Sequence, residues 1–425
     1  MGLWQWLWRL LGGGPERPAT NNRPAPDSPP KKAPRRRRVR LARRRASRTR
    51  ESRHIASAET VPTKPYRFAR PCVTGGWLDL SRDGDPEHLE RTGLPAFQNP
   101  QELADWLEIS LGKLAWLVHR FDEAQLPAEE RRAHYHFRWL KKRSGGRRLI
   151  ESPKPTLKRV QQQILRQILD RIPPHTSAHG FVAGRSILTN ATPHAGQRVL
   201  LKFDLENFYA TVGLSRVAAI FRSLGYSREA AIWLARLTTS ALPNSAFRSK
   251  DSAQDISPYR RRHLPQGAPT SPALANLSAF SLDLRLTGLA RSFGAKYTRY
   301  ADDLTFSGDE RFLRSLAVFI PLVEQIVREE RFRTNKAKRR VIRNHSRQQV
   351  TGVVVNHQPN VARCEFDRLK AILTNCVRRG PSTQNHDHVP DFAAHLRGSI
   401  AHFIHLNANR GERLMALYDR IDWNR

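Results

Sequence analysis

The stretch TRYADDLTFSG, residues 298–308, places two aspartates, Asp302 and Asp303, next to each other. The segments on either side, AKYTRY and LTFSG, predict two strands joined by a tight turn that carries both acids. Adjacent carboxylates repel, so each one makes the other costlier to ionise. Because the chain has 73 Lys and Arg residues against only 38 Asp and Glu residues, this concentration of negative charge needs a physical reason.

A third acid suggests that reason. Asp204 ends the apolar segment VLLKF, about a hundred residues before the turn, and we expect it to lie at a neighbouring strand end. Three such carboxylates form a negative cup that suits divalent cations, and hard oxygen ligands favour Mg²⁺. Two ions about 3.5–4 Å apart would serve phosphoryl transfer. The alternative for an isolated Asp-Asp pair is two exposed turn residues.

Strands and helices alternate along the chain, which predicts an α+β catalytic core with its acids at strand ends and turns. Hydrophobic spacing predicts two short helices within 101–121, further helices over 156–172, 214–237, 271–290 and 315–330, and a mostly helical 363–425. Strands are expected within 198–212 and 348–356, and residues 134–153 predict a basic hairpin with a Gly-Gly turn.

The net charge of +35 indicates a polyanionic partner, with nucleic acid the first candidate and an anionic membrane surface the second. Residues 1–60 hold 16 basic and 4 acidic residues, a net of +12, and 31–50 alone carry 2 Lys and 10 Arg without an acid. Self-repulsion predicts disorder there in isolation. We expect an arm that binds RNA or DNA; a solvated tail is the alternative.

Cysteine usage and hydropathy bear on the compartment. Cys72, Cys364 and Cys376 are scattered without a C-x-x-C spacing, which fits a reducing, cytoplasmic environment and predicts no structural zinc site. The sequence has no apolar stretch long enough to span a bilayer, so we expect no membrane partner. The Trp-rich residues 3–11 suit an interfacial or partner-binding helix, or an unimportant tail end, and the sequence does not decide between these.

Four motifs, in order over about 220 residues, resemble those of reverse transcriptases. YADD (300–303) resembles their catalytic turn and FDLENFYA (203–210) their first acidic strand. LPQGAPTSPALANL (264–277) is similar to the segment that positions the nucleotide, and GRRLIESPKPTLKRVQ (146–161) to the fingers hairpin and the following helix. HGFVAGRSILTNATPH (179–194), VTGVVVN (350–356) and residues 393–423 resemble elements of the bacterial retron group.

The resemblance implies a right-hand polymerase fold with fingers, palm and thumb, preceded by a disordered basic extension. The expected divisions are an extension at 1–65, a helical region at 66–135, fingers at 136–195, a palm with part of the fingers at 196–357, and a helical thumb for RNA recognition at 358–425.

The resemblance also implies roles for individual residues. Asp204, Asp302 and Asp303 would be catalytic and hold two Mg²⁺ ions, with Mn²⁺ as a possible substitute and the Leu205 carbonyl as a further ligand. Residues implied to bind the nucleotide are Lys141, Arg148, Tyr209, Gln266, Gly267 and Lys338. Those implied to bind RNA or primer are Asn190, His194, Val350, Thr351 and Gly352.

Two of these roles have alternatives that the sequence leaves open. Tyr209 lies where the family's steric gate against ribonucleotides is found, but it also suits a core tyrosine packed beside Phe208. Lys338 resembles a lysine that protonates the leaving pyrophosphate, but it also fits a solvated run of charges.

The implied activity is RNA-directed DNA synthesis from dNTPs. A cognate structured noncoding RNA would serve as template and, through a guanosine 2′-OH, as primer, giving branched multicopy single-stranded DNA (msDNA). The family context adds a role in anti-phage defence beside a separate effector protein. The alternatives are a reverse transcriptase of another bacterial class, such as a group II intron-like or diversity-generating enzyme, and a non-enzymatic RNA-binding protein on a polymerase scaffold.

Overall fold

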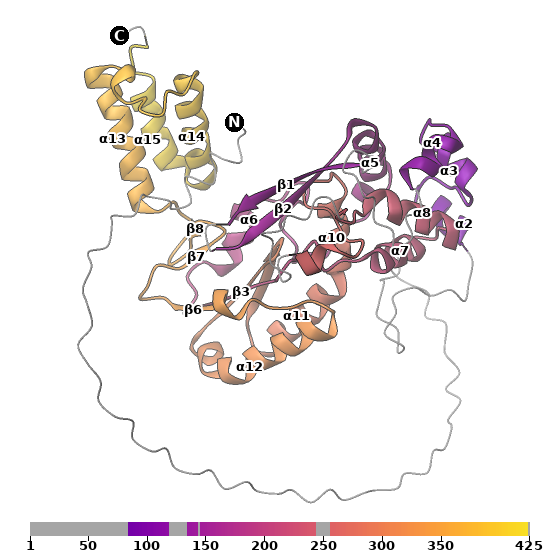
Figure 1. Cartoon of the computed structure of the whole chain (residues 1–425). Coiled ribbons are helices and arrows are strands. Elements are labelled where there is room, and N and C mark those ends of the chain that lie inside the picture. Colours follow the sequence, from indigo (N-terminus) through magenta and orange to yellow (C-terminus); the bar gives the residue numbers. More distant parts are fainter. Residues whose placement is uncertain (1–83, 119–133, 143–144, 244–255, 424–425) are drawn as a thin grey trace, which may run out of the picture. The chain divides into compact units, whose positions relative to one another are not determined.

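The structure is a computed structural model that describes residues 84–118, 134–142, 145–243 and 256–423 (Figure 1). Contacts divide the chain into two units, Met1–Val61 and Pro62–Arg425, and every described residue belongs to the second. The predicted basic arm within the 1–65 extension, the Trp-rich residues 3–11 and Cys72 lie outside the described residues.

A four-stranded antiparallel sheet forms the centre of the fold. Its strands are β3 (Val199–Asp204), β4 (Lys296–Tyr300), β5 (Asp303–Gly308) and β6 (Arg340–Arg343), in the order β4-β5-β3-β6. The hairpin predicted from TRYADDLTFSG is therefore confirmed, and the strand that ends in Asp204 is its direct neighbour. Strand β6 was missed, because Arg340–Arg343 continues a run of basic residues that shows little apolar pattern.

The two faces of this sheet differ in chemistry, because successive side chains of a strand point to opposite faces. Val199, Leu201 and Phe203 of β3 belong to the main hydrophobic core, together with Leu304, Phe306 and Tyr297. The alternate positions carry Lys202 and Asp204, with Thr305 and Asp303 as their register partners on β5. One face is thus apolar, and the other is polar and carries the acids.

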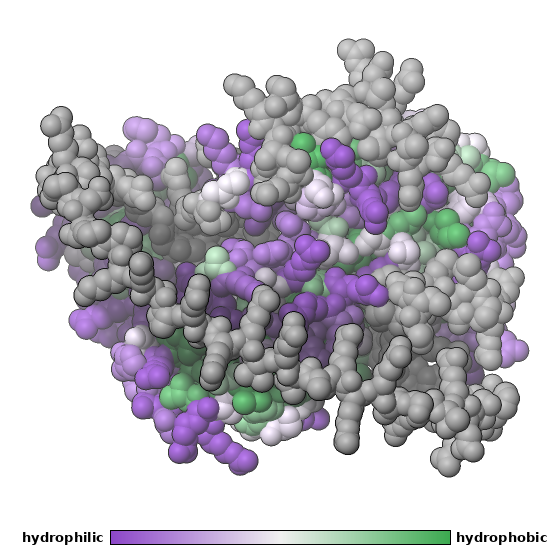
Figure 2. Space-filling model, turned by 60° about the horizontal axis from the view of Figure 1, so that its bottom comes forward, coloured by the Kyte–Doolittle hydropathy of each residue, from purple (hydrophilic) through white to green (hydrophobic). Residues whose placement is uncertain are grey.

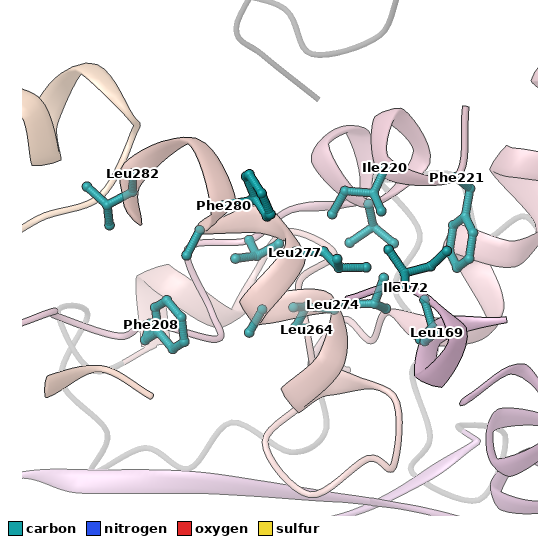
Figure 3. Packing of buried hydrophobic residues seen from close by; sticks show 14 of the residues in the cluster. Leu169, Ile172, Phe208, Ile220, Phe221, Leu264, Leu274, Leu277, Phe280 and Leu282 are labelled. Carbon is teal, nitrogen blue, oxygen red and sulfur yellow. The ribbon is translucent and has the colours of Figure 1, made fainter. Parts of the chain in front are cut away.

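Two helices, α11 (Phe280–Ser292) and α12 (Glu310–Glu329), pack against the apolar face (Figure 1). The same core continues into α7 (Leu214–Ser223), α8 (Arg228–Thr238) and α10 (Ser271–Ser278). Figure 3 shows side chains of α7, α10 and the segment around the short 3-10 helix η2 (Leu169–Arg171) gathered in it. The expected helix over 214–237 is broken into α7 and α8 around Gly225, which has φ of 111°.

The N-terminal part of the described chain agrees with the sequence pattern. It contains α2 (Pro86–Arg91), α3 (Pro100–Trp106) and α4 (Leu111–Leu117); the last two are the two short helices predicted within 101–121, and Ser110 is the N-cap of α4. The basic hairpin is formed by β1 (Tyr135–Lys141) and β2 (Arg147–Pro153), followed by α5 (Pro155–Gln167). Further short elements are α6 (Ile187–Ala191) and the 3-10 helices η3 (Thr192–His194), η5 (Ser257–Tyr259) and η6 (Lys336–Lys338).

The single strand expected over 348–356 is instead a small hairpin of β7 (Gln349–Val350) and β8 (Val353–Val354). Its turn is Thr351-Gly352, with φ values of 47° and 86°. Valine content alone indicated a buried strand and gave no sign of a reversal. The glycine at Gly352 was the available signal, since it supplies the left-handed conformation that the turn needs.

The C-terminal part is helical, as predicted, with α13 (Arg363–Arg379), the 3-10 helix η7 (Pro381–Thr383), α14 (Phe392–Leu406) and α15 (Ala408–Tyr418). Leu373, Ile400, Phe403 and Leu414 of these helices are buried in a second hydrophobic cluster, together with the free thiol of Cys376. The same cluster includes Leu200 of β3 and the valines of the β7–β8 segment, so it joins these helices to the central sheet. The other cysteine in the described chain, Cys364, is exposed.

Within the described ranges, no helix is both long and apolar enough to cross a membrane. Hydrophilic side chains predominate among the coloured residues on the face shown in Figure 2, and hydrophobic ones form only small separate patches.

The packing of α14 against α15 generates a prediction about two glycines. A Cβ at Gly411 would lie 2.5 Å from Cα of Ile404, so Gly411→Ala should push the helices apart and destabilise them by about 1–3 kcal/mol. Gly398, on α14, has nothing within 4 Å of such a Cβ, so Gly398→Ala should stabilise its helix by up to about 1 kcal/mol. Hydrogen exchange of peptides from 392–418 would measure both; faster exchange in both variants would contradict the packing.

Candidate active site

The three predicted acids meet at one end of the sheet. Asp204 of β3 and Asp303 of β5 are direct register partners, so their side chains leave the same face. Asp302 occupies the two-residue turn between Tyr300 and Asp303, and its carbonyl accepts a hydrogen bond from the N–H of Leu205 at 2.9 Å. The chain thus brings together residues that are about a hundred positions apart, as the sequence predicted.

The turn that carries Asp302 has an unusual backbone. Ala301 has φ of 54°, a left-handed conformation that costs a non-glycine residue roughly 1–2 kcal/mol. The backbone of Gly180 lies directly on this turn: a Cβ at Gly180 would be 2.6 Å from the nitrogen of Ala301. Only glycine fits there, so the HGF segment packs backbone to backbone against the turn.

Charge repulsion shapes the ionisation of the acids. Burial, then the negative charges of Asp303 and Asp204, raise the pKa of Asp302 from 3.8 to about 6. Burial also raises the pKa of Asp303, although nearby Lys202 opposes the shift. Two neighbouring carboxyls with elevated pKa values indicate a site short of positive charge.

The ammonium of Lys338 supplies part of that charge. Its Nζ lies 2.8 Å from Oδ1 of Asp204. The lysine is held there because the N–H of Asn335, just before η6, donates to the Asp204 carbonyl at 2.8 Å. Lys338 is therefore paired with one of the three acids, although its side chain remains 49% exposed.

The donor set fits divalent cations. Within the described residues, no three His, Cys, Asp or Glu side chains already stand in a preformed metal-binding arrangement. The acids nevertheless share one sheet end and raise one another's pKa, and a lysine ammonium already sits against one of them, as a cation would. Asp204, Asp302 and Asp303 could hold such ions, and the Leu205 carbonyl lies at the same strand end.

A buried ion pair supports the turn from behind. Arg299, immediately before Tyr300, is fully buried and forms a bidentate pair with Asp283 of α11, at 2.8 Å through Nε and 2.6 Å through Nη2. Its Nη1 donates to Oδ1 of Asn276 at 2.9 Å and to the carbonyl of Ala301 at 3.1 Å. Arg299 therefore ties the catalytic turn to α10 and α11.

Tyr209 lies close enough to Asp302 and Arg148 for the charges of both to affect its pKa. The pKa of Tyr209 is raised by burial and next by the charge of Asp302, while Arg148 opposes the shift. Tyr209 is thus electrostatically coupled both to the turn and to the exposed face of the β1–β2 hairpin. The centroid of its ring also lies 5.6 Å from that of Phe208. Packing beside Phe208 is therefore compatible with a position near the acids. Lys141 is exposed at the end of β1.

The segment with Gln266 and Gly267 is fastened to the same hairpin. The Gln266 carbonyl accepts from the N–H of Glu151 at 2.9 Å, and a Cβ at Gly267 would lie 2.9 Å from the Glu151 carbonyl oxygen. The side chain of Glu151 also forms a fully buried pair with His263 at 2.8 Å. Burial lowers the pKa of His263, but Glu151 outweighs this effect and raises it overall.

The residues expected to contact RNA or primer are only partly accessible. The amide nitrogen of Asn190 lies 3.4 Å from the Thr351 hydroxyl, so the structure brings the two motifs together. Gly352, beside Thr351, is half-buried in the β7–β8 turn. Asn190 and Val350, however, are buried, with exposures of 1% and 0%. These two side chains have almost no exposed surface, and their part in RNA or primer binding stays a prediction.

His194 lies in the interior as well. It is completely buried between β4 and β5, where its ring nitrogens lie 2.8 Å from the Thr298 hydroxyl and 2.7 Å from that of Ser307. Burial, and next the charge of Lys296, lower the pKa of His194 to about 3, so the ring is neutral. His194 links η3 to β4 and β5 through these contacts, and its part in RNA or primer recognition stays a prediction.

Sequence reasoning missed the supporting residues Arg299, Asp283 and Asn276. Arg299 lies within the quoted stretch, and a charged residue at an inward position of a strand was the signal that could have identified it. Asp283 and Asn276 lie in predicted helices with no distinguishing pattern, so only the fold brings them to Arg299.

The raised pKa of Asp302 predicts a stability change. Between pH 3.8 and about 6 the folded protein retains a proton that the unfolded chain has lost, so stability falls as pH rises through this window. Above it, the charged Asp302 destabilises the metal-free protein. Asp302→Asn should then raise the melting temperature at pH 8 in chelator by a few degrees, on the order of 1 kcal/mol. Added Mg²⁺ should stabilise the wild type more than the variant.

The matched control is Asp105→Asn, an exposed aspartate on α3 whose hydrogen bond from Gln101 an asparagine can keep. Its melting temperature should follow that of the wild type with and without Mg²⁺. A variant Asp302→Asn that melts below the wild type in chelator would show that the acids do not repel one another.

The network behind the turn predicts a positioning effect. Arg299→Lys keeps a positive charge but loses the forked contacts, so the turn should shift and reduce the rate constant of primer extension about 100-fold. The Mg²⁺ concentration for half-maximal rate should rise, which a purely structural loss of folded protein would not cause. Arg285→Lys is the control, since the partly exposed Arg285 of α11 pairs with the exposed Glu329 and the buried Glu330 and not with the catalytic turn. Equal effects of the two changes would remove the positioning role.

Comparison with known proteins identifies the family to which this chain is similar. The family model described as "Reverse transcriptase (RNA-dependent DNA polymerase)" matches residues 140–355, which contain the acids and the hairpin. The retron Mx65 reverse transcriptase of Myxococcus xanthus is 40% identical over 334 residues, 78% of this chain and 73% of the relative. Retron Mx162 reverse transcriptase, from the same organism, is 37% identical over 75% of this chain and 66% of its own length.

A more distant relative covers a similar span. Retron Ec86 reverse transcriptase of Escherichia coli is 29% identical over 337 residues, 79% of this chain and 92% of that protein. The matched span, the right-hand fold and the acids on one strand pair agree with one another. This chain belongs to the retron reverse transcriptases and is an RNA-directed DNA polymerase.

Proposed function

We propose that this protein copies a cognate structured noncoding RNA into branched msDNA, starting from a guanosine 2′-OH of that RNA, in the cytoplasm. The single observation that carries the chemistry is the pairing of Asp204 with Asp303, with Asp302 in the adjoining turn. The similarity to retron enzymes supports the RNA template and the branched product. A defence role beside a separate effector protein is part of the proposal on the same basis.

Asp204, Asp302 and Asp303 are assigned to two Mg²⁺ ions, with help from the Leu205 carbonyl. Such ions would activate the attacking hydroxyl and stabilise the leaving oxygen. Lys338, now on Asp204, is near enough to this site to donate a proton to the departing pyrophosphate. These assignments draw on the shared sheet end and the raised pKa values.

Nucleotide selection is assigned to the surface between the hairpin and the turn. Lys141 and Arg148 would hold the triphosphate, since both are exposed on the β1–β2 hairpin. Gln266 and Gly267 would lie against the new base pair. Tyr209 would exclude ribonucleotides by crowding the sugar 2′ position. The effect of the Asp302 charge on its pKa supports this role.

RNA recognition is assigned to the C-terminal helices and the basic arm. Helix α13 has a row of exposed basic side chains, which suits the phosphate backbone of a folded RNA. These side chains are Arg363, Arg368, Lys370, Arg378 and Arg379. The turn of Thr351 and Gly352 would support the primer end.

Primer extension tests the enzymatic part. The wild type should add dNTPs to a DNA primer on an RNA template with Mg²⁺ or Mn²⁺, while the double variant Asp302→Asn, Asp303→Asn should lose at least about 1,000-fold in rate, because its site can no longer bind the ions. The Asp105→Asn variant controls for altered charge on an exposed helix. Absence of incorporation by the wild type with either metal would refute the assignment.

Sequencing of nucleic acid that co-purifies with the protein tests the retron part. We expect one structured RNA together with single-stranded DNA joined to it, and a debranching nuclease that cuts 2′–5′ linkages should separate the two. DNA that is free of RNA before that treatment would leave the polymerase in place but reject the 2′-OH primer.

A further inference from the structure

Phe181 combines two unfavourable features at one position. It is a large apolar side chain that is 46% exposed, and it belongs to none of the hydrophobic clusters in the described chain. Its φ is 60°, in the left-handed region that bulky residues rarely adopt. A glycine would accept this backbone without strain and without exposing an apolar ring. Neither packing nor local conformation therefore explains a phenylalanine here.

The backbone that carries Phe181 is firmly held. The segment before it runs beside β4: the N–H of Arg299 donates to the Ser177 carbonyl and that of His179 to the Arg299 carbonyl, both at 2.7 Å. Nδ2 of Asn276 donates to the carbonyl of Gly180 at 2.9 Å. Together with the close approach of Gly180 to Ala301, these contacts fix where the ring of Phe181 can lie.

That location adjoins the catalytic turn. The rings of Phe181 and Tyr300 have centroids 6.4 Å apart at an angle of 39°, and Tyr300 is two residues before Asp302. Tyr300 is itself only half-buried. The two rings form a partly exposed aromatic surface beside the acids, which we call the aromatic step.

We propose that Phe181 is a stacking platform for the template–primer: its ring packs against a base or sugar of the RNA–DNA hybrid beside the primer end. Every base has a π-face, so an aromatic ring binds it without regard to sequence, which suits an enzyme that must accept each template position in turn. Because the backbone is already fixed, binding loses little conformational entropy there. The inference rests on the proposed role of the neighbouring aspartates.

Three variants separate the ring from the backbone. Phe181→Gly removes the ring and relieves the left-handed strain, so its melting temperature should equal or exceed that of the wild type. Phe181→Ala removes the ring and keeps the strain, and Phe181→Tyr keeps both. Binding of a fluorescent RNA–DNA template–primer to the full chain is measured by anisotropy in chelator, where no extension occurs.

The Kd should rise about 5- to 150-fold for Phe181→Gly and Phe181→Ala, and stay within about twofold for Phe181→Tyr. The control is Glu108→Gly, an exposed residue with φ of 55° outside the aromatic step, which relieves the same kind of strain and should leave the Kd unchanged. Two results would overturn the inference: an unchanged Kd for Phe181→Gly, or equal losses for Phe181→Tyr and Phe181→Gly. Primer extension by the wild type is assayed in parallel. If the wild type extends the primer but either of these two results is found, the stacking role fails and the proposed catalytic site does not.

Discussion

The antiparallel register between β3 and β5 is the constraint on which the site depends. It sets Asp204 opposite Asp303 and, in the same ladder, Leu201 opposite Phe306. Side chains alternate between the two faces, so a slip of one residue would turn Asp204 into the apolar core and expose its hydrophobic neighbours. The hydrophobic core beneath the sheet therefore enforces the pairing of Asp204 with Asp303, while Arg299 also holds the turn that carries Asp302.

The two faces of the sheet differ in how their charged groups are balanced. On the open face, carboxyls crowd together, and lysine ammonium groups offset their charge only in part. On the buried face, Arg299 and Asp283 have no exposure to water, but their forked pairing and the added acceptors Asn276 and Ala301 satisfy the guanidinium. Removing one member of a buried pair costs far more than the pair itself contributes. The catalytic turn is thus held by an interaction that tolerates little change.

The sequence predicted the parts of this fold that have a local signal. The turn at Asp302, the strand that ends in Asp204 and the Gly-Gly hairpin each carry turn chemistry or strand periodicity. The strand predicted over 348–356 is divided into two by the Thr351-Gly352 turn, and valine content alone does not reveal that division. The burial of His194 had no local signal either, because it depends on where Thr298 and Ser307 lie. Burial of a polar residue is a property of the assembled fold.

The fastening of the Gln266 segment to β2 has a mechanical consequence. The buried Glu151–His263 pair and the close contact of Gly267 with Glu151 pack the 263–267 segment tightly against β2. The β1–β2 hairpin therefore cannot move independently of this segment. A displacement of β2 would displace the 263–267 segment with it, so these two parts of the chain behave as one rigid unit.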